Sequence, residues 1–309
     1  MAKLADLQRF DVLFDQIPDL ADKPREVEEL SGGLTNLNLK VTTPRGVFVA
    51  RCNRSNAGLL GIDREAERFN TQAAEVAGVG APYVDFRADL GILVIGYING
   101  TTYENADLRK EGALTRVADA CRTLHSGPRF TGDFDMFARQ RTYLRTVTDN
   151  GFALPPDYGD YEDKFGQIEA ALAVRAGPTV PCNNDLLAGN FVDDGQKLWL
   201  IDYEYSGNND PFFELGNTWT ECGLEADHLD ELVTAYAGHH SPSKIARTRL
   251  QAIVSQYGWS LWGYIQAATN EFDFDFHGWG QDRFEGSVAE FRSPSFTGLL
   301  DAAAGVDRS

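Results

Sequence analysis

An aspartate and an asparagine in one short segment, Asp185 and Asn190, have the types and spacing that phosphoryl transfer requires. They stand five positions apart, so one loop can direct a carboxylate and an amide toward the same site. Asp202 ends an apolar segment (198–201), and a hairpin turning at 193–195 would fold it back beside Asn190. Oxygen ligands of this kind suit Mg²⁺, which also binds water and substrate phosphates. We therefore predict Asp185 as the general base, with Asn190 and Asp202 as magnesium ligands.

The sequence around these residues resembles one family. Residues 182–190, followed by 198–210 and 214–217, are similar to the choline/ethanolamine kinase family. That family belongs, with the aminoglycoside kinases, to the protein-kinase-like small-molecule phosphotransferases. The similarity extends from about Gly32 to about Phe284. A lone Asp-x4-Asn spacing is common by chance, whereas its pairing with an apolar strand that ends in Asp is much less so.

The resemblance implies a fold, a reaction and two cofactors. The fold is of the α+β class, two-lobed and protein-kinase-like, with an N-terminal antiparallel sheet and helix and a larger, mainly helical C-terminal lobe. The reaction is ATP-dependent phosphorylation of a small amino alcohol on its hydroxyl, choline first, with ATP and Mg²⁺ as cofactors. Ethanolamine, its methylated forms or another amino alcohol are alternative substrates, because an apolar pocket discriminates only modestly among a few methyl groups. An aminoglycoside-type or other small-molecule kinase is a further alternative, which predicts a wide acidic cleft and little dependence on the tryptophans.

The loop departs from the family at Asn183, where the family has histidine. In the family that histidine braces the loop backbone and transfers no proton, so an amide is expected to replace it. The departure also supports an alternative of a different class, a pseudokinase that binds ligands without catalysis. The presence of Asp185, Asn190 and Asp202 favours the enzyme, because loss of function usually appears first at those positions.

A small-residue turn between two expected strands is the candidate nucleotide loop. It contains Gly32, Gly33 and Asn36. Glycine lets backbone N–H groups approach a phosphate closely, because it has no Cβ. A Gly-Gly pair between strands is more often a plain hairpin turn, and only the downstream loop favours nucleotide binding here.

Arg51, at the end of the next expected strand, is the candidate cation for the nucleotide phosphates. The resemblance favours Glu67 over Glu65 as the acid that positions it; the alternative is an arginine paired with any surface acid. Tyr97 and Ile98 fall in a hinge-like segment where the backbone would meet adenine.

The composition changes from strand-like to helical after residue 100. We therefore predict an N-terminal nucleotide-binding lobe over 1–99 and a C-terminal lobe with the catalytic loop and substrate pocket over 100–309. Apolar spacing predicts helices at about 4–17, 64–77, 111–124, 134–147 and 161–174.

Three of the five tryptophans, Trp259, Trp262 and Trp279, lie within 21 residues. Trp259 and Trp262 are three positions apart and share one face of a helix. Tryptophan faces bind quaternary ammonium groups, at about 2 kcal/mol or more for a desolvated contact. Without context, tryptophans at helical spacing are more often core residues, but the resemblance places these three at cage positions of a choline pocket.

Two acids, Glu204 and Glu221, match acids of the family and are predicted to bind the cationic substrate; the alternative is an ordinary structural ion pair. A further aromatic residue of the family pocket has no counterpart around 224–226. His125, at the end of an expected helix, is assigned a capping or packing role.

The composition excludes some partners. A net charge of −18 argues against nucleic acid, since no basic stripe exists to neutralise phosphates, and it suits a small cationic substrate or serves solubility alone. The four cysteines have neither disulfide nor metal-ligand spacing. Without an apolar run long enough for a membrane span, and without a signal peptide, the sequence indicates a cytoplasmic protein. It allows a homodimer without specifying one.

Overall fold

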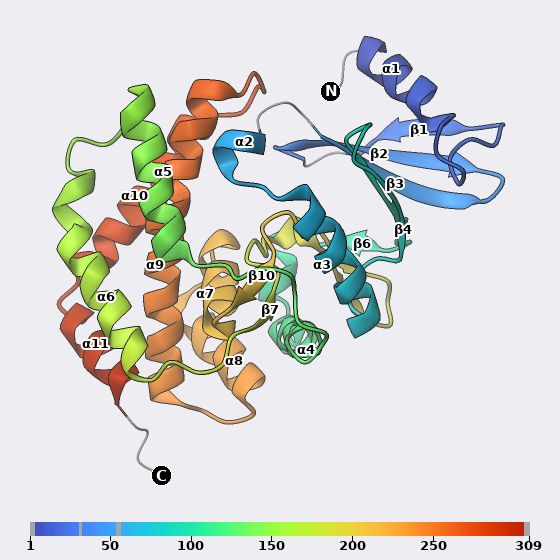
Figure 1. Cartoon of the computed structure of the whole chain (residues 1–309). Helices are drawn as coiled ribbons and strands as arrows, with labels where there is room; N and C mark the ends of the chain where they lie inside the picture. Colours follow the sequence, from blue (N-terminus) through green and yellow to red (C-terminus); the bar gives the residue numbers. More distant parts are fainter. Residues whose placement is uncertain (1–3, 31–32, 54–56, 306–309) are drawn as a thin grey trace.

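The computed structural model describes residues 4–30, 33–53 and 57–305. An antiparallel five-stranded sheet, in the order β1-β2-β3-β5-β4, forms the N-terminal part, with helices on both sides of it (Figure 1). This arrangement, followed by a mainly helical C-terminal part, confirms the predicted α+β class. The elements of the N-terminal part are α1 (Leu4–Phe14), β1 (Glu26–Glu29), β2 (Asn36–Thr43), β3 (Gly46–Asn53), α2 (Ala57–Leu60), α3 (Arg64–Ala77), β4 (Tyr83–Arg87) and β5 (Ile92–Gly96).

Alternating side chains explain why β2 packs as it does. Leu37, Leu39 and Val41 are buried on one face of the sheet, where they pack with Phe14 of α1. The leading helix is shorter than the predicted 4–17, because the chain leaves the helix after Phe14 while still burying the next apolar side chains.

Helix α3 begins and ends with strong caps. The Asp63 carboxylate accepts hydrogen bonds from the backbone N–H groups of Glu65 and Ala66, both at 3.0 Å. Gly78 ends the helix at φ +84°, a conformation that glycine adopts without strain. These caps fix the helix that carries Glu67 next to the sheet.

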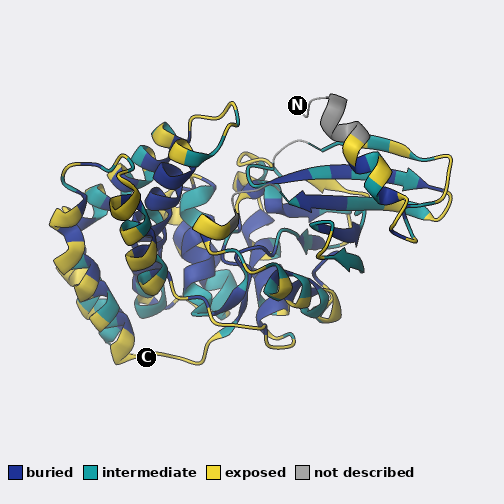
Figure 2. Cartoon of the chain, turned by 45° about the horizontal axis from the view of Figure 1, so that its top comes forward, coloured by how far each residue is buried: buried dark blue, intermediate teal, exposed yellow. Residues whose placement is uncertain are grey.

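The C-terminal part is built around α9 (Pro242–Thr269), a 28-residue helix against which α5, α7, α10 and α11 pack. Figure 2 shows the buried residues where these helices meet and the exposed residues on their outer faces. Trp259 and Trp262 lie on α9, and Trp279 lies on α10. The remaining helices are η1 (Asp107–Arg109), α4 (Ala113–His125), α5 (Met136–Asn150), η2 (Tyr158–Tyr161), α6 (Glu162–Val174), η3 (Ala188–Asn190), α7 (Pro211–Glu221), α8 (Ala226–Ala237), α10 (Phe276–Phe291) and α11 (Phe296–Ala304).

Two small sheets position the predicted catalytic loop. The hairpin expected from the sequence is present, because β8 pairs with β9 in an antiparallel register. The loop lies between β7 and β8, and Asp202 follows β9. The strands of these sheets are β6 (Thr101–Thr102), β7 (Val180–Cys182), β8 (Phe191–Asp193), β9 (Leu198–Leu200) and β10 (Gly207–Asn209).

An ion pair anchors this hairpin to α4, and its removal tests the fold. The pKa of Asp193 lies well below its ordinary value, and the largest cause is hydrogen bonding by the Arg116 guanidinium. Asp193 also accepts a hydrogen bond from Tyr103 Oη at 3.1 Å. A lowered folded-state pKa means that the stabilisation is present above the ordinary carboxyl pKa and is lost as the pH falls below it. We expect Asp193→Asn to lower the free energy of unfolding by about 1 kcal/mol at pH 7, because Arg116 is partly exposed and solvent screens the pair.

Urea unfolding of the wild type and of Asp193→Asn at pH 7 and pH 3 checks this prediction. The difference in free energy of unfolding between the two proteins should be smaller at pH 3. An equal difference at the two pH values would mean that the ion pair is not its source.

Candidate active site

A cavity of about 360 Å³ brings together residues from distant segments of the chain. They include the turn at 33–35, the loop 185–190, the segment after β9, and the helices α7, α9 and α10. The acids on its wall outnumber the bases, since Arg283 is the one basic residue among the described lining residues. The residues predicted from sequence that line it are Gly33, Asp185, Asn190, Asp202, Glu204, Glu221, Trp259, Trp262 and Trp279.

The loop is held by hydrogen bonds between its own residues. Asn190 Nδ2 donates to the carbonyl oxygen of Asp185 at 2.7 Å, which brings the two ends of the loop together. Asn184 and Asp202 have left-handed backbone conformations, with φ of +68° and +66°. Such conformations are costly for residues other than glycine and occur where the surrounding structure enforces them, often at functional sites.

Asn183 braces the loop where the family has histidine. Its side-chain Nδ2 donates to the carbonyl oxygens of Ile201 at 3.1 Å and Asp202 at 2.8 Å, while its Oδ1 accepts from the N–H of Asp185 at 3.1 Å. One buried amide therefore joins the loop to the segment that carries Asp202. This geometry suits the expectation that an amide can serve as the brace.

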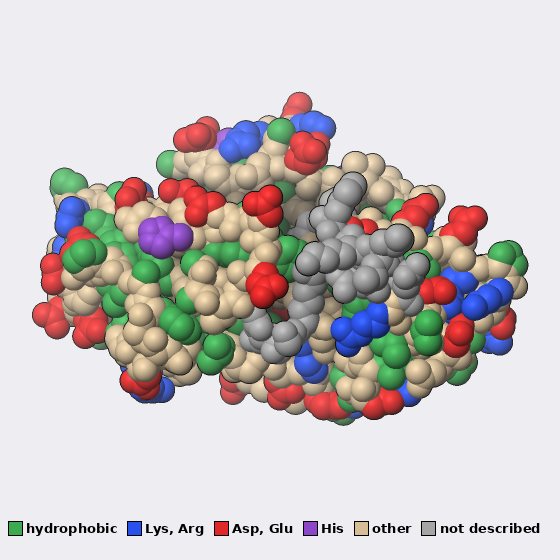
Figure 3. Space-filling model, turned by 90° about the horizontal axis from the view of Figure 1, so that it is seen from above, with side chains coloured by type: hydrophobic (Ala, Val, Ile, Leu, Met, Phe, Trp, Pro, Cys, Tyr) green, Lys and Arg blue, Asp and Glu red, His purple; other side chains and the backbone are tan. Residues whose placement is uncertain are grey.

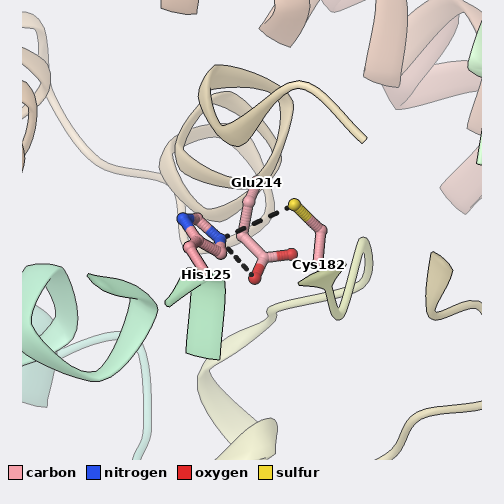
Figure 4. Close-up of side chains that lie close together, drawn as sticks. All are labelled: His125, Cys182 and Glu214. Carbon is pink, nitrogen blue, oxygen red and sulfur yellow. Dashed lines mark hydrogen bonds and ion pairs between the residues drawn. The ribbon is translucent and has the colours of Figure 1, made fainter. Parts of the chain in front are cut away.

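A buried cluster beneath the loop was not anticipated from the sequence (Figure 4). Glu214 Oε2 accepts the N–H of Asn184 at 2.6 Å, and Glu214 Oε1 lies 3.3 Å from Nε2 of His125. Cys182 Sγ lies 3.6 Å from the same nitrogen, and Tyr236 Oη lies 2.8 Å from Nδ1 of the histidine. The cysteine spacing gave no sign of this cluster, because its members come from four distant elements, α4, β7, α7 and α8.

The hydrogen bonds within the cluster satisfy its buried polar groups and hold the strained peptide at Asn184 in place. Burial raises the pKa of the Cys182 thiol well above its ordinary value, which keeps it protonated. The cluster thus supports the loop from behind, and His125 does more than cap its helix.

The Asp185 carboxylate faces an acidic environment. Burial raises its pKa well above the ordinary value, and the charges of Asp202, Glu221 and Glu204 raise it further, while Arg283 acts in the opposite direction. In the described part of the chain, no hydrogen bond joins this carboxylate to the protein. A half-buried carboxylate with no protein partner is available to accept a proton from a bound hydroxyl.

The donor set of Asn190 and Asp202 fits Mg²⁺. Both residues line the cavity and present an amide oxygen and a carboxylate, the hard oxygen donors that this ion prefers. Asn190 uses its Nδ2 within the loop, which turns its Oδ1 away from that bond. Asp202 Oδ1 accepts from Arg51 Nη2 at 2.5 Å, so the arginine sits directly behind the proposed ligand.

Arg51 lies between two acids from different parts of the chain. Its Nη2 is 3.3 Å from Glu67 Oε1 as well as close to Asp202. Burial alone would lower its pKa, but the charges of Asp202, Glu67 and Glu204 outweigh that effect and raise it. The buried guanidinium therefore stays charged and links the sheet, through β3 and α3, to the segment after β9.

The structure places the other predicted nucleotide residues as follows. Gly33 lines the cavity, and a Cβ there would lie 2.5 Å from the carbonyl oxygen of Asn36, so the turn requires glycine. Gly32 lies outside the described residues. Tyr97 and Ile98 follow β5 and are not among the described residues that line the cavity.

Glu204 ties the turn to the catalytic loop region. Its Oε1 accepts from Thr35 Oγ1 at 2.7 Å, and its Oε2 accepts from Asn36 Nδ2 at 2.8 Å and from Arg64 Nη1 at 3.3 Å. Burial is the largest cause that raises the pKa of Glu204 to about 7, and the nearby charge of Asp202 adds to it. Both carboxylate oxygens are thus engaged by protein groups.

The three tryptophans line the cavity together with Tyr205, an aromatic residue that was not predicted from the sequence. Tyr205 Oη accepts a hydrogen bond from Trp262 Nε1 at 2.8 Å, and the rings of Tyr205 and Trp259 lie 4.9 Å apart. The Trp262 and Trp279 rings meet at 5.1 Å. The signal was present in the sequence, because Tyr205 lies one residue after Glu204 in the segment already singled out.

Glu221 and Trp279 share one neighbour, Arg283. Its guanidinium pairs with Glu221 and also lies over the Trp279 ring.

Seen from above, acidic side chains are spread over the molecule, with Lys and Arg in separate groups among them (Figure 3). Among the described helices, none is long and apolar enough to cross a membrane.

Comparison with known proteins identifies one protein family to which the chain is similar. The family model described as choline/ethanolamine kinase matches residues 27–245. The crystal structure of a choline/ethanolamine kinase family protein from Mesorhizobium loti is 31% identical, covers 96% of this chain and 99% of its own, and superposes with a TM-score of 0.85.

Two curated relatives are more distant. Protein LicA of Haemophilus influenzae is 28% identical over 257 residues, which cover 78% of this chain and 73% of that protein. A probable ethanolamine kinase of Arabidopsis thaliana is 25% identical over 301 residues, which cover 86% of this chain and 80% of the plant protein.

Proposed function

Because the chain belongs to the choline/ethanolamine kinase family, we propose that it transfers the γ-phosphoryl group of ATP to the hydroxyl of choline, giving phosphocholine and ADP. The observation that carries this proposal is the shared cavity, in which Asp185 and the three tryptophans Trp259, Trp262 and Trp279 line one space. A candidate base and an aromatic pocket for a cation thereby line the same cavity of about 360 Å³.

The residues take separate roles in this reaction. Asp185 orients the choline hydroxyl and accepts its proton as the oxygen attacks the phosphorus, and the bond to the ADP oxygen breaks. Asn190 and Asp202 would hold Mg²⁺, which neutralises charge on the phosphates. We assign residues 1–99 to the nucleotide-binding lobe and 100–309 to the lobe with the base and the substrate pocket.

On the nucleotide side, Arg51 would hold the nucleotide phosphates, with Glu67 positioning it and with its charge kept by its bonds to Glu67 and Asp202. Gly33 allows the turn to approach them closely. Asn36 acts through Glu204, which it helps to hold, and Tyr97 and Ile98 remain candidates for the adenine contact.

The direct test is ATP turnover with Mg²⁺ and choline, ethanolamine or an aminoglycoside as acceptor. We expect saturable turnover with choline at the highest kcat/KM. Turnover with ethanolamine or the aminoglycoside at higher kcat/KM would assign the enzyme to that substrate, and ATP binding without turnover on all three would indicate a pseudokinase.

Removing one cage ring gives a second, more specific test. We expect Trp262→Ala to raise KM for choline by about 30-fold, because a desolvated ring contact with a quaternary ammonium contributes about 2 kcal/mol. Trp262→Phe keeps an aromatic face and loses only the bond to Tyr205, so it should change KM much less. Steady-state kinetics at saturating ATP measure both; an unchanged KM in the alanine variant would refute the cage.

A further inference from the structure

A side-on ion pair lies on the cavity wall beside the aromatic pocket. Arg283 Nη2 is 2.5 Å from Glu221 Oε2, and its Nε is 3.3 Å from Oε1, so one guanidinium engages both oxygens of the carboxylate. The side chains are 19% and 5% exposed. The guanidinium carbon also lies 3.6 Å from the centroid of Trp279. Arg283 therefore fixes an acid and a ring of the same pocket.

The acids around the pocket are almost all occupied by protein groups. Among the described residues on its wall, Glu221 is paired with Arg283, and both oxygens of Glu204 accept from the turn and from Arg64. Asp202 is bonded to Arg51, and Asp185, with no such partner, is assigned to the reacting hydroxyl. Among the described lining residues, the tryptophans thus offer aromatic faces, and the acids other than Asp185 already have protein partners.

The pairing of these acids affects primary and quaternary ammonium head groups differently, because only the primary group needs hydrogen-bond acceptors. A primary ammonium carries three N–H donors, and each one loses a water partner on burial unless the pocket supplies an acceptor. A quaternary ammonium has no N–H donor that needs an acceptor, and aromatic faces attract it without a hydrogen bond. A pocket whose acids are occupied favours the quaternary group.

We propose that Arg283 is a specificity-determining residue: by engaging Glu221 and stacking on Trp279, it withholds a carboxylate from the head-group pocket and favours a quaternary over a primary ammonium. This inference rests on the proposed function and explains how the same site would discriminate between choline and ethanolamine. Arg283 acts through Glu221 and Trp279, and it is therefore a positioning residue.

Arg283 has a second effect, which the test must separate from the first. Its positive charge opposes the acids that raise the pKa of Asp185. Its loss is expected to change the turnover of both substrates alike, because both react at the same base. The ratio of kcat/KM for ethanolamine to kcat/KM for choline cancels that common effect and reports selectivity alone.

The experiment compares Arg283→Met, which keeps a long side chain against Trp279, with the double variant Arg283→Met/Glu221→Gln. We expect the ethanolamine-to-choline ratio of kcat/KM to rise by about tenfold or more in the single variant, the scale of one hydrogen bond to a charged group. The double variant removes the freed carboxylate and should return toward the wild-type ratio. Arg283→Lys, which keeps the charge but loses the planar fork, should give an intermediate ratio.

Binding without turnover separates failure of this inference from failure of the proposed function. Quenching of tryptophan fluorescence by tetramethylammonium and by methylammonium reports head-group preference in the absence of ATP. We expect wild type to prefer tetramethylammonium and Arg283→Met to lose much of that preference. If wild type turns over no choline, the proposed function falls, while the fluorescence comparison still decides the role of Arg283.

Two outcomes would overturn the inference. One is an unchanged substrate ratio and unchanged ion preference in a folded Arg283→Met protein, with thermal unfolding as the check on folding. The other is an equal change in the single and double variants, because Glu221 would then not be the acceptor that Arg283 withholds. Should Arg283→Met fail to fold, Arg283→Lys gives the same comparison with the pair only weakened.

Discussion

Asp185→Ala is expected to lower kcat by about 10³-fold, the effect of removing a general base, with little change in KM for ATP. Among the acids that line the cavity, Asp185 is the one whose carboxylate has no hydrogen-bond partner in the described part of the protein. Asp202 is bonded to Arg51, Glu204 to Thr35, and Glu221 to Arg283. Steady-state and single-turnover kinetics with choline check the size of the effect. Undiminished turnover would refute the assignment of the base.

The same variant should not weaken the fold. Removing the Asp185 side chain breaks no hydrogen bond to the residues that the structure describes, and it relieves repulsion from three nearby acids. We expect the free energy of unfolding to stay constant or rise by about 1 kcal/mol in the absence of nucleotide and metal. Asp185→Asn is the matched variant, since it keeps the shape and removes the charge. A large loss of stability in both variants would show that the activity loss reflects unfolding.

Spacing along the chain predicted the parts of the site that local geometry determines. Asp185 and Asn190 lie in one loop, and the 191–201 hairpin could be recognised from its apolar runs and turn, so their approach to Asp202 followed. Trp259 and Trp262 could be placed on one helix face by their separation of three. In each case the distance in sequence is short.

The partners of the site residues could not be predicted from spacing. Glu221 and Arg283 are separated by 62 positions, and Glu204 and Thr35 by 169, so only the packing of whole elements brings each pair together. For this reason both acids, predicted as substrate-binding residues, have protein partners whose identity the sequence did not reveal. The sequence indicates that acids lie near a cation site, but it does not show which of their carboxylates already have protein partners.

The cluster under the loop is the clearest case of such a long-range dependence. Glu214 is fully buried on α7, and His125 at the end of α4 is 89 positions away. The Glu214 carboxylate is the acceptor for the N–H of Asn184, whose left-handed conformation directs Asp185 toward the cavity. The loop geometry therefore depends on a residue that does not line the cavity.

Glu214→Leu should consequently impair both stability and turnover. It leaves the Asn184 N–H buried without its acceptor and takes one of its partners from His125, which should lower the free energy of unfolding by about 3 kcal/mol. It also releases the peptide before Asp185, and a misplacement of about 1 Å can lower kcat by about 10²-fold while leaving KM for ATP near its wild-type value.

Glu214→Gln keeps an oxygen that can accept from Asn184 and should retain most of the stability and most of the turnover. Urea unfolding and kcat of the two variants therefore distinguish a brace from a filler of the core: equal losses in both would show that the charge of Glu214 matters, and wild-type behaviour of the leucine variant would show that the loop holds its shape without it.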